Sequence, residues 1–148
     1  MKKILFFGCL LCICSSIFSQ GIDSAFRFNS SGILVQKVRM ALIAENVANI
    51  TTLKVEETGL PYQKKYAVVV STGDGAKIEK VERSPVPFGK YWDPAVPQSD
   101  ENGFIYYPNV NLPDEMVNLT YTEAALEANF ATFKTTKSLY QSAIDTFK

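Results

Sequence analysis

The sequence predicts an α+β protein in which long N- and C-terminal helices pair as a coiled-coil-like inner domain, with a small antiparallel β domain inserted between them. Apolar residues recur at alternating spacings of three and four along both ends of the chain, the period of packed helices. The middle holds all but one of the seven prolines, together with short β-rich runs. We therefore divide the chain into a signal peptide (1–19), an N-terminal helical arm (20–53), a small β-rich domain (54–111) and a C-terminal helical arm (112–148).

The bulk composition excludes two classes of protein. The 148 residues are 47% apolar and 20% charged, a balance that is typical of a folded chain rather than a disordered one. Basic and acidic residues number 15 each, so no net field favours nucleic acid. No basic stripe interleaved with aromatic residues is present either. We expect no nucleic-acid binding.

The first 19 residues have the pattern of an export signal. Lys2 and Lys3 precede an uncharged apolar run over 4–14, and small residues then lead to a predicted cut after Ser19. An uncleaved membrane anchor and lipidation at Cys9 are the alternatives. Cleavage removes all three cysteines, so the mature protein would have neither a disulfide nor a thiolate site. The signal predicts delivery to the periplasm.

The first arm is predicted to be helical over about 22–50. Its stripe follows the 4-3 spacing but is interrupted by Asn29 and Gln36, and Gly32 is expected to weaken the first turns. Asn49 and the β-branched pair 51–52 are poor interior residues of a helix, so they predict its end.

The middle segment is predicted to contain three strands, over 62–70, 76–84 and 103–108. The stretch "STGDGA" joins the first two as a hairpin turn, and "SDENG" precedes the third. These features predict a small antiparallel unit.

The last arm is predicted to be one helix of about 35 residues that runs from Leu112 to the end of the chain. Pro113 and the two carboxylates after it suit a helix N-terminus. Only Glu123 and Lys137 interrupt its apolar stripe.

Stripes this apolar need a surface that covers them, because exposed large side chains are costly and promote aggregation. One interpretation is a closed monomeric hairpin of two helices with a β cap. The other is that the helices also pack against further copies, which the small β unit favours. On that second interpretation the subunit interface comprises Ile33, Met40, Ile43, Val47, Met116, Leu119, Leu126, Phe130, Phe133, Tyr140 and Ile144.

Chemistry is scarce in this sequence. The chain has no histidine, the commonest general base and metal ligand. Adjacent carboxylates at 56–57, 100–101 and 114–115 are interpreted as solvated loop residues. The stretch "DENG" (100–103) lacks the later glutamate of a calcium loop, so a hairpin turn is favoured. We expect no enzyme activity, no catalytic residues, no cofactor, no metal and no small-molecule substrate.

Two segments resemble a known family. "NVANITT" (46–52) is similar to the Asn-x-Ala-Asn-x-x-Thr signature of bacterial flagellar axial proteins, which form rods and hooks. "DPAVPQSDENGFIYYPNVNLPDEMVNL" (93–119) resembles the proximal rod members of that family. The motif positions are Asn46, Ala48, Asn49, Thr52, Gly103, Pro108, Asn109, Val110, Glu115, Met116, Val117 and Asn118.

The resemblance implies a structural subunit of the flagellar basal-body rod. That rod is a hollow tube that is built from the terminal helices of its subunits and transmits torque. It implies that the partners are copies of the chain and other rod proteins, with the basal-body ring and the export apparatus as further candidates. The signal departs from the family pattern, in which subunits are exported without a cleaved leader. The alternative is a periplasmic homologue that acts as a binding or adaptor protein without polymerising.

Overall fold

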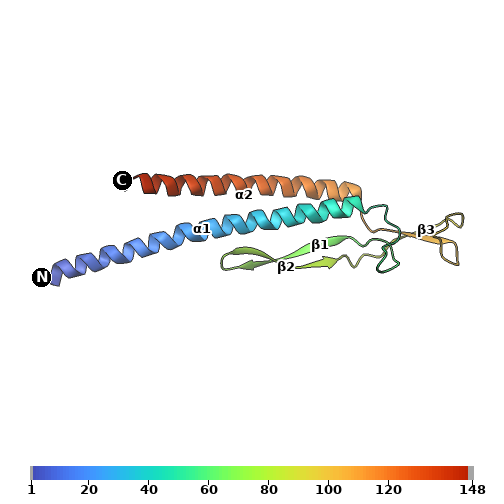
Figure 1. The fold of residues 1–148 in the computed structure, drawn as a ribbon, viewed down its shortest axis with the longest axis horizontal. Helices are drawn as coiled ribbons and strands as arrows, with labels where there is room; N and C mark the ends of the chain where they lie inside the picture. The colour runs from blue at the N-terminus through green and yellow to red at the C-terminus, as the bar shows by residue number, and fades with distance from the viewer. Residues whose placement is uncertain (1, 147–148) are drawn as a thin grey trace.

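The computed structural model describes the backbone of residues 2–146 and the side chains of residue 21 and residues 23–146. It has the predicted α+β class, two long helices flanking a small antiparallel β region (Figure 1). The predicted signal peptide lies outside the residues whose side chains are described. Within the part of the chain whose side chains are described, no helix is long and apolar enough to cross a membrane. The elements are α1 (Lys2–Ala48), β1 (Lys65–Thr72), β2 (Gly75–Arg83), β3 (Gly89–Trp92), β4 (Phe104–Tyr107) and α2 (Leu112–Thr146).

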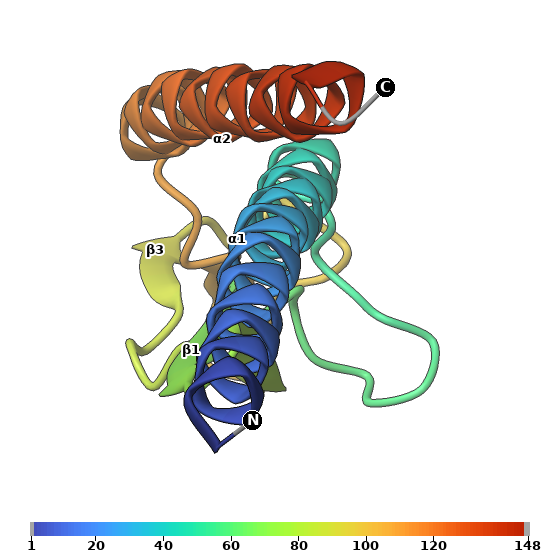
Figure 2. The ribbon, with the colours of Figure 1, turned by 90° about the vertical axis from the view of Figure 1, so that its left-hand side faces the viewer.

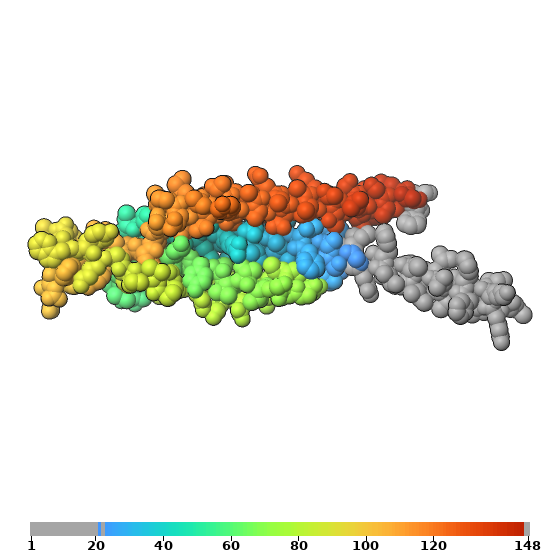
Figure 3. Space-filling view, turned by 180° about the vertical axis from the view of Figure 1, so that it is seen from behind, coloured from blue at the N-terminus to red at the C-terminus, as the bar shows by residue number. Residues whose placement is uncertain are grey.

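Helix α1 is the central element of the fold. Helix α2 runs antiparallel along one side of it, and the β1–β2 hairpin lies along another (Figures 1 and 2). The space-filling view shows the same three layers, with α1 between α2 and the hairpin (Figure 3). Strands β3 and β4 lie beyond the end of α1 and the start of α2, at the far end of the molecule from the last turn of α2 (Figure 1). Among the described elements, α2 contacts only α1.

The seam between α1 and α2 mixes aromatic and polar contacts. The ring of Phe26 meets the ring of Phe133 edge to face, with centroids 5.5 Å apart. The Asn29 amide donates a hydrogen bond of 3.1 Å to the Thr136 hydroxyl. A Cβ at Gly32 would lie 2.8 Å from Oδ1 of Asn129, so this glycine permits close approach of the two helices. Helix α1 therefore continues through Gly32, although the sequence predicted weak turns there.

The β region consists of two separate two-stranded sheets. Strands β1 and β2 pair antiparallel from Lys65–Arg83 to the turn, with a register shift between Val68 and Val69. This confirms the predicted hairpin. Strand β3, which the sequence analysis did not predict, pairs with β4. Prolines 85 and 87 precede its four residues, and proline 94 follows them. A segment so rich in proline is typical of a loop, so this strand is recognised only through its pairing partner.

The tip of the β1–β2 hairpin rests directly on α1. Gly75 has a φ of 126°, and a Cβ there would lie only 2.1 Å from Oγ of Ser31 and 3.3 Å from Cα of Phe28. The Ser31 hydroxyl in turn accepts a hydrogen bond of 3.1 Å from the N–H of Ala76. The absence of a side chain at Gly75 therefore lets the hairpin lie against the helix.

We predict that Gly75→Ala lowers the free energy of unfolding by about 1–3 kcal/mol, because the new methyl group both strains the backbone and collides with Ser31. Gly73→Ala, in the same turn, is the matched control, since a Cβ there meets nothing within 4 Å. Urea denaturation of both variants checks this. Equal stability of the two would mean that the hairpin tip does not rest on α1.

Candidate functional site

Asn46, the first asparagine of the family motif, lies in the last turn of α1 with its side chain 1% exposed. Its Oδ1 accepts hydrogen bonds of 2.9 Å from the N–H of Lys65 and from the hydroxyl of Tyr62. Its Nδ2 donates to the carbonyl of Lys65 at 2.9 Å and to Oε2 of Glu115 at 3.3 Å. Every donor and acceptor of the amide is therefore used, which neither Asp nor Leu could reproduce.

Glu115 brings α2 to the same place. It lies in the first turn of α2, is 1% exposed, and its Oε1 lies 2.5 Å from Nζ of Lys64. The sequence analysis interpreted the 114–115 carboxylate pair as solvated, which is wrong for Glu115. Its carboxylate is turned inward because Asn46 and Lys64 supply the partners that a buried charge requires. We call Asn46, Tyr62, Lys64, Lys65 and Glu115 the junction.

Tyr62 and Lys65 connect the junction to further charges. Lys65 forms an ion pair of 2.5 Å with Glu45, the residue immediately before Asn46 on α1. Tyr62 is 6% exposed. Burial is the main cause that raises the pKa of Tyr62 to about 12, and the carboxylates of Glu45 and Glu115 add to it. The phenol is therefore held neutral, as its hydrogen bond to Asn46 requires.

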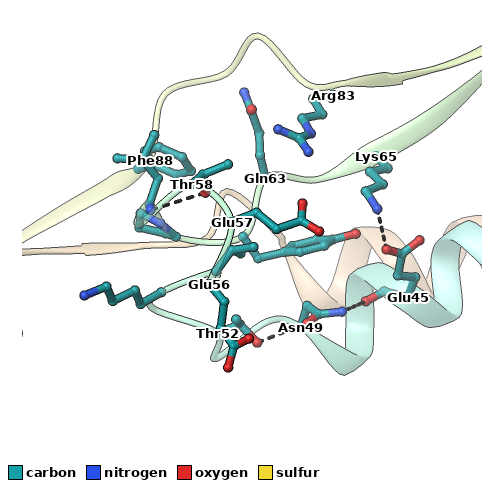
Figure 4. A pocket seen from close by; sticks show the side chains of 15 residues that line it. Glu45, Asn49, Thr52, Glu56, Glu57, Thr58, Gln63, Lys65, Arg83 and Phe88 are labelled. Carbon is teal, nitrogen blue, oxygen red and sulfur yellow. Dashed lines mark hydrogen bonds and ion pairs between the residues drawn. The ribbon is translucent and has the colours of Figure 1, made fainter.

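Asn49, the second asparagine of the motif, ends the helix. Its Nδ2 donates a hydrogen bond of 2.9 Å to the carbonyl of Glu45, and its Oδ1 accepts one of 3.1 Å from the Thr52 hydroxyl. This carbonyl of the last turn of α1, which also accepts the backbone N–H of Asn49, thus gains a second donor. The helix ends at Ala48, which confirms the end that the sequence predicted. Figure 4 shows Asn49 and Thr52 at the edge of a groove of about 510 Å³ beside the Glu45–Lys65 ion pair.

The second half of the motif adds a further connection. Oδ1 of Asn109 accepts a hydrogen bond of 2.9 Å from the N–H of Lys64, and its Nδ2 donates one of 2.8 Å to the carbonyl of Val86. Pro108 beside it is buried. Gly103 has a φ of 79°, and a Cβ there would lie 3.1 Å from Nε1 of Trp92. Asn109 thus links Lys64 of the junction to the loop that precedes β3.

The remaining motif residues do not join this network. Val110 is half-buried, while Ala48 and Asn118 are exposed. Met116 and Val117 are 60% and 55% exposed on α2. The motif therefore contains two groups, one that locks the fold and one that faces outward.

The residues predicted for the subunit interface also divide into two groups. Ile43 is buried within the chain, and six others are half-buried: Ile33, Met40, Val47, Leu119, Leu126 and Phe133. Tyr140 is 47% exposed and meets the ring of Phe26 edge to face. The others, Met116, Phe130 and Ile144, are 60%, 45% and 38% exposed. Together with Glu123 and Lys137 they form a row spaced seven residues apart, which we call the exposed stripe.

The sequence analysis missed Tyr62, Lys64 and Lys65. They lie in a run predicted as a strand, and no spacing in one sequence relates position 62 or 64 to positions 46 and 115. Glu115 was named as a motif position and as part of the predicted helix N-terminus, but without its partners Asn46 and Lys64. An asparagine at the end of an apolar helix was the one signal that pointed to this region.

The contacts of the junction are hydrogen bonds and ion pairs that hold distant segments of the chain together. Among the described residues, no group of three or more His, Cys, Asp or Glu side chains could hold a metal ion. Two long terminal helices with a β region inserted between them in the chain, joined at the end of α1 that carries the motif asparagines, match the architecture that the resemblance to the flagellar axial proteins implies.

Comparison with known proteins narrows that class. Residues 101–146 match the family described as flagellar basal body rod FlgEFG protein C-terminal. The flagellar basal-body rod protein FlgC of Agrobacterium fabrum is 30% identical over 86% of this chain and 96% of that protein. FlgC of Borreliella burgdorferi is 28% identical over 84% and 96%, and FlgC of Salmonella typhimurium is 31% identical over 77% and 89%. The chain belongs to the FlgC family of flagellar basal-body rod proteins.

We predict that Asn46→Ala destabilises the fold by about 3 kcal/mol or more, since it leaves several buried polar groups without partners. Asn118→Ala is the matched control from the same motif, because Asn118 is exposed and should change stability by less than about 0.5 kcal/mol. Chemical denaturation followed by circular dichroism measures both. If the two variants lose the same stability, the junction does not hold the fold.

The raised pKa of Tyr62 predicts a loss of stability at alkaline pH. The pKa of Tyr62 in the folded chain, about 12, lies above the ordinary tyrosine value of 10.0, so the stabilisation is complete below pH 10 and is lost as pH rises toward 12. The full effect is about 2–3 kcal/mol. Urea denaturation between pH 9 and pH 12 measures it. Tyr62→Phe should flatten this decline, whereas Tyr121→Phe, at a position 73% exposed, should leave it unchanged.

Proposed function

We propose that this chain is a structural subunit of the flagellar basal-body rod and that it polymerises through its terminal helices into a hollow tube that transmits torque. Its membership of the FlgC family supports the place in the rod. The observation that supports polymerisation is that the apolar residues of α2 fall into two groups. Residues 119, 126 and 133 pack on α1, while the exposed stripe has no cover within the described chain.

The small core supports the same conclusion. Among the described residues, Val35, Ile43, Tyr62 and Ile105 are the only buried apolar side chains apart from two prolines. In contrast, α2 leaves most of its surface open along 35 residues. Covering Met116, Phe130 and Ile144 would contribute on the order of 1 kcal/mol each, since each is already partly shielded. A neighbouring subunit can supply that cover.

The mechanism is mechanical and involves no bond chemistry. The junction fixes where the β region sits relative to the helix pair, so each subunit acts as one stiff body. Partners in this proposal are copies of the chain, other rod proteins, and the basal-body ring and export apparatus. The location is the basal body within the periplasm, reached through a signal that ends at Ser19.

Intact-mass spectrometry of the rod fraction of purified basal bodies tests the location and the export route together. A species that begins at Gln20 supports both. A full-length species there would mean that the leader is retained. Recovery in periplasmic extract but not in basal bodies would contradict the rod function and favour the non-polymerising adaptor.

We predict that Phe130→Asp abolishes assembly of this chain into rods, because a carboxylate would be buried at the subunit contact. Val81→Asp places the same charge on an exposed apolar residue of the hairpin and should leave assembly intact. Electron microscopy of basal bodies from cells that carry each variant is the readout, with circular dichroism as the check of folding. Normal rods in the Phe130 variant would remove this face from the contact.

A further inference from the structure

The order of residues along the exposed stripe points to a particular contact. We propose that the exposed stripe binds the same stripe of a second copy of this chain, parallel to it and displaced by two heptads along the helix. This inference rests on the proposed function, since it specifies the contact through which copies assemble. It names both the partner and the register.

The stripe reads Met116, Glu123, Phe130, Lys137, Ile144, at a spacing of seven that keeps all five on one face of α2. A displacement of 14 residues is about 21 Å along a helix. It places Met116 against Phe130 of the second copy and Phe130 against Ile144. In the layer between them, Glu123 meets Lys137. Apolar residues thus meet apolar ones, and the opposite charges pair.

Charge supports this register. Glu123 and Lys137 are exposed, and within the described part of the chain neither forms an ion pair. Each also has a like charge close on its own helix, Glu127 four residues after Glu123 and Lys134 three residues before Lys137. Like charges at such spacings are mildly unfavourable in an isolated helix. The displaced copy brings a lysine to the acidic half of α2 and a glutamate to the basic half.

Two other registers are less favourable for assembly. Parallel stripes without displacement would place Glu123 against Glu123 and Lys137 against Lys137, which is repulsive. An antiparallel pair centred on Phe130 would match the charges, but the contact would be identical on both copies and would close as a dimer. The displaced parallel contact uses residues 116–130 of one copy and residues 130–144 of the other, so only Phe130 belongs to both parts. Residues 137–144 of the first copy and 116–123 of the second stay free for the next subunit.

A charge exchange in the full-length chain tests the pairing of Glu123 with Lys137. Glu123→Lys and Lys137→Glu should each weaken self-association at least tenfold in sedimentation velocity, and the double variant should recover to within about threefold of the unchanged chain. Asp93→Lys is the control, an exposed charge near the distal sheet that should have no effect. Failure of the double variant to recover would overturn the pairing.

Disulfide cross-linking distinguishes the registers, in a full-length background with Cys9, Cys12 and Cys14 replaced by serine. A chain carrying both Met116→Cys and Phe130→Cys should give a ladder of trimers and higher species on oxidation. Phe130→Cys alone should remain uncross-linked. A strong dimer from Phe130→Cys alone would establish the antiparallel pair and overturn the proposal.

The outcomes also separate this inference from the proposed function. If the unchanged chain assembles and Phe130→Asp prevents it, but neither the charge exchange nor the ladder is seen, only the register is wrong. If the unchanged chain does not self-associate and is absent from rods, both the inference and the proposed function fail.

Discussion

The four hydrogen bonds of the Asn46 amide connect three segments that are far apart in the chain: the end of α1, the start of β1 and the first turn of α2. Because two of these bonds go to the backbone of Lys65, the amide behaves like a strand partner at the edge of β1. The directions in which the β region and α2 leave α1 both depend on this one side chain. The apolar contacts add stability, but they are too few to specify that geometry alone.

Polar side chains also position the two helices relative to each other along the seam between them. Asn29 meets Thr136, Gly32 admits Asn129, and Asn46 meets Glu115, so polar or small groups recur along an otherwise apolar contact. A sliding of one helix along the other would separate these pairs. Buried polar residues fix register in coiled coils at some cost in stability, and this seam fits that pattern. These contacts therefore fix the alignment of the two helices more than they increase the stability of the subunit.

The pattern of residues close together in the sequence predicted the elements that form from such neighbouring residues. The period of the apolar residues gave both helices, and the end of α1 followed from Asn49 and the threonines after it. Strand β3 was missed because its only signal is the partner β4. The burial of Glu115 was missed because it depends on Lys64 and Asn46, which are remote in sequence. The motif residues could be named from resemblance, but their roles required the pairing of positions 46, 62 and 115.

The placement of α1 between α2 and the hairpin affects the order in which the newly made chain can fold. The bond between Asn29 and Thr136 joins residues 107 positions apart, and the bond between Asn46 and Glu115 spans 69. Contacts between such distant residues form late, because long loops must close before any contact rewards them. The face of α1 that carries Phe26, Asn29 and Gly32 also lacks its partner until α2 has been synthesised. The contact between α1 and the hairpin can therefore form before the seam between the two helices does.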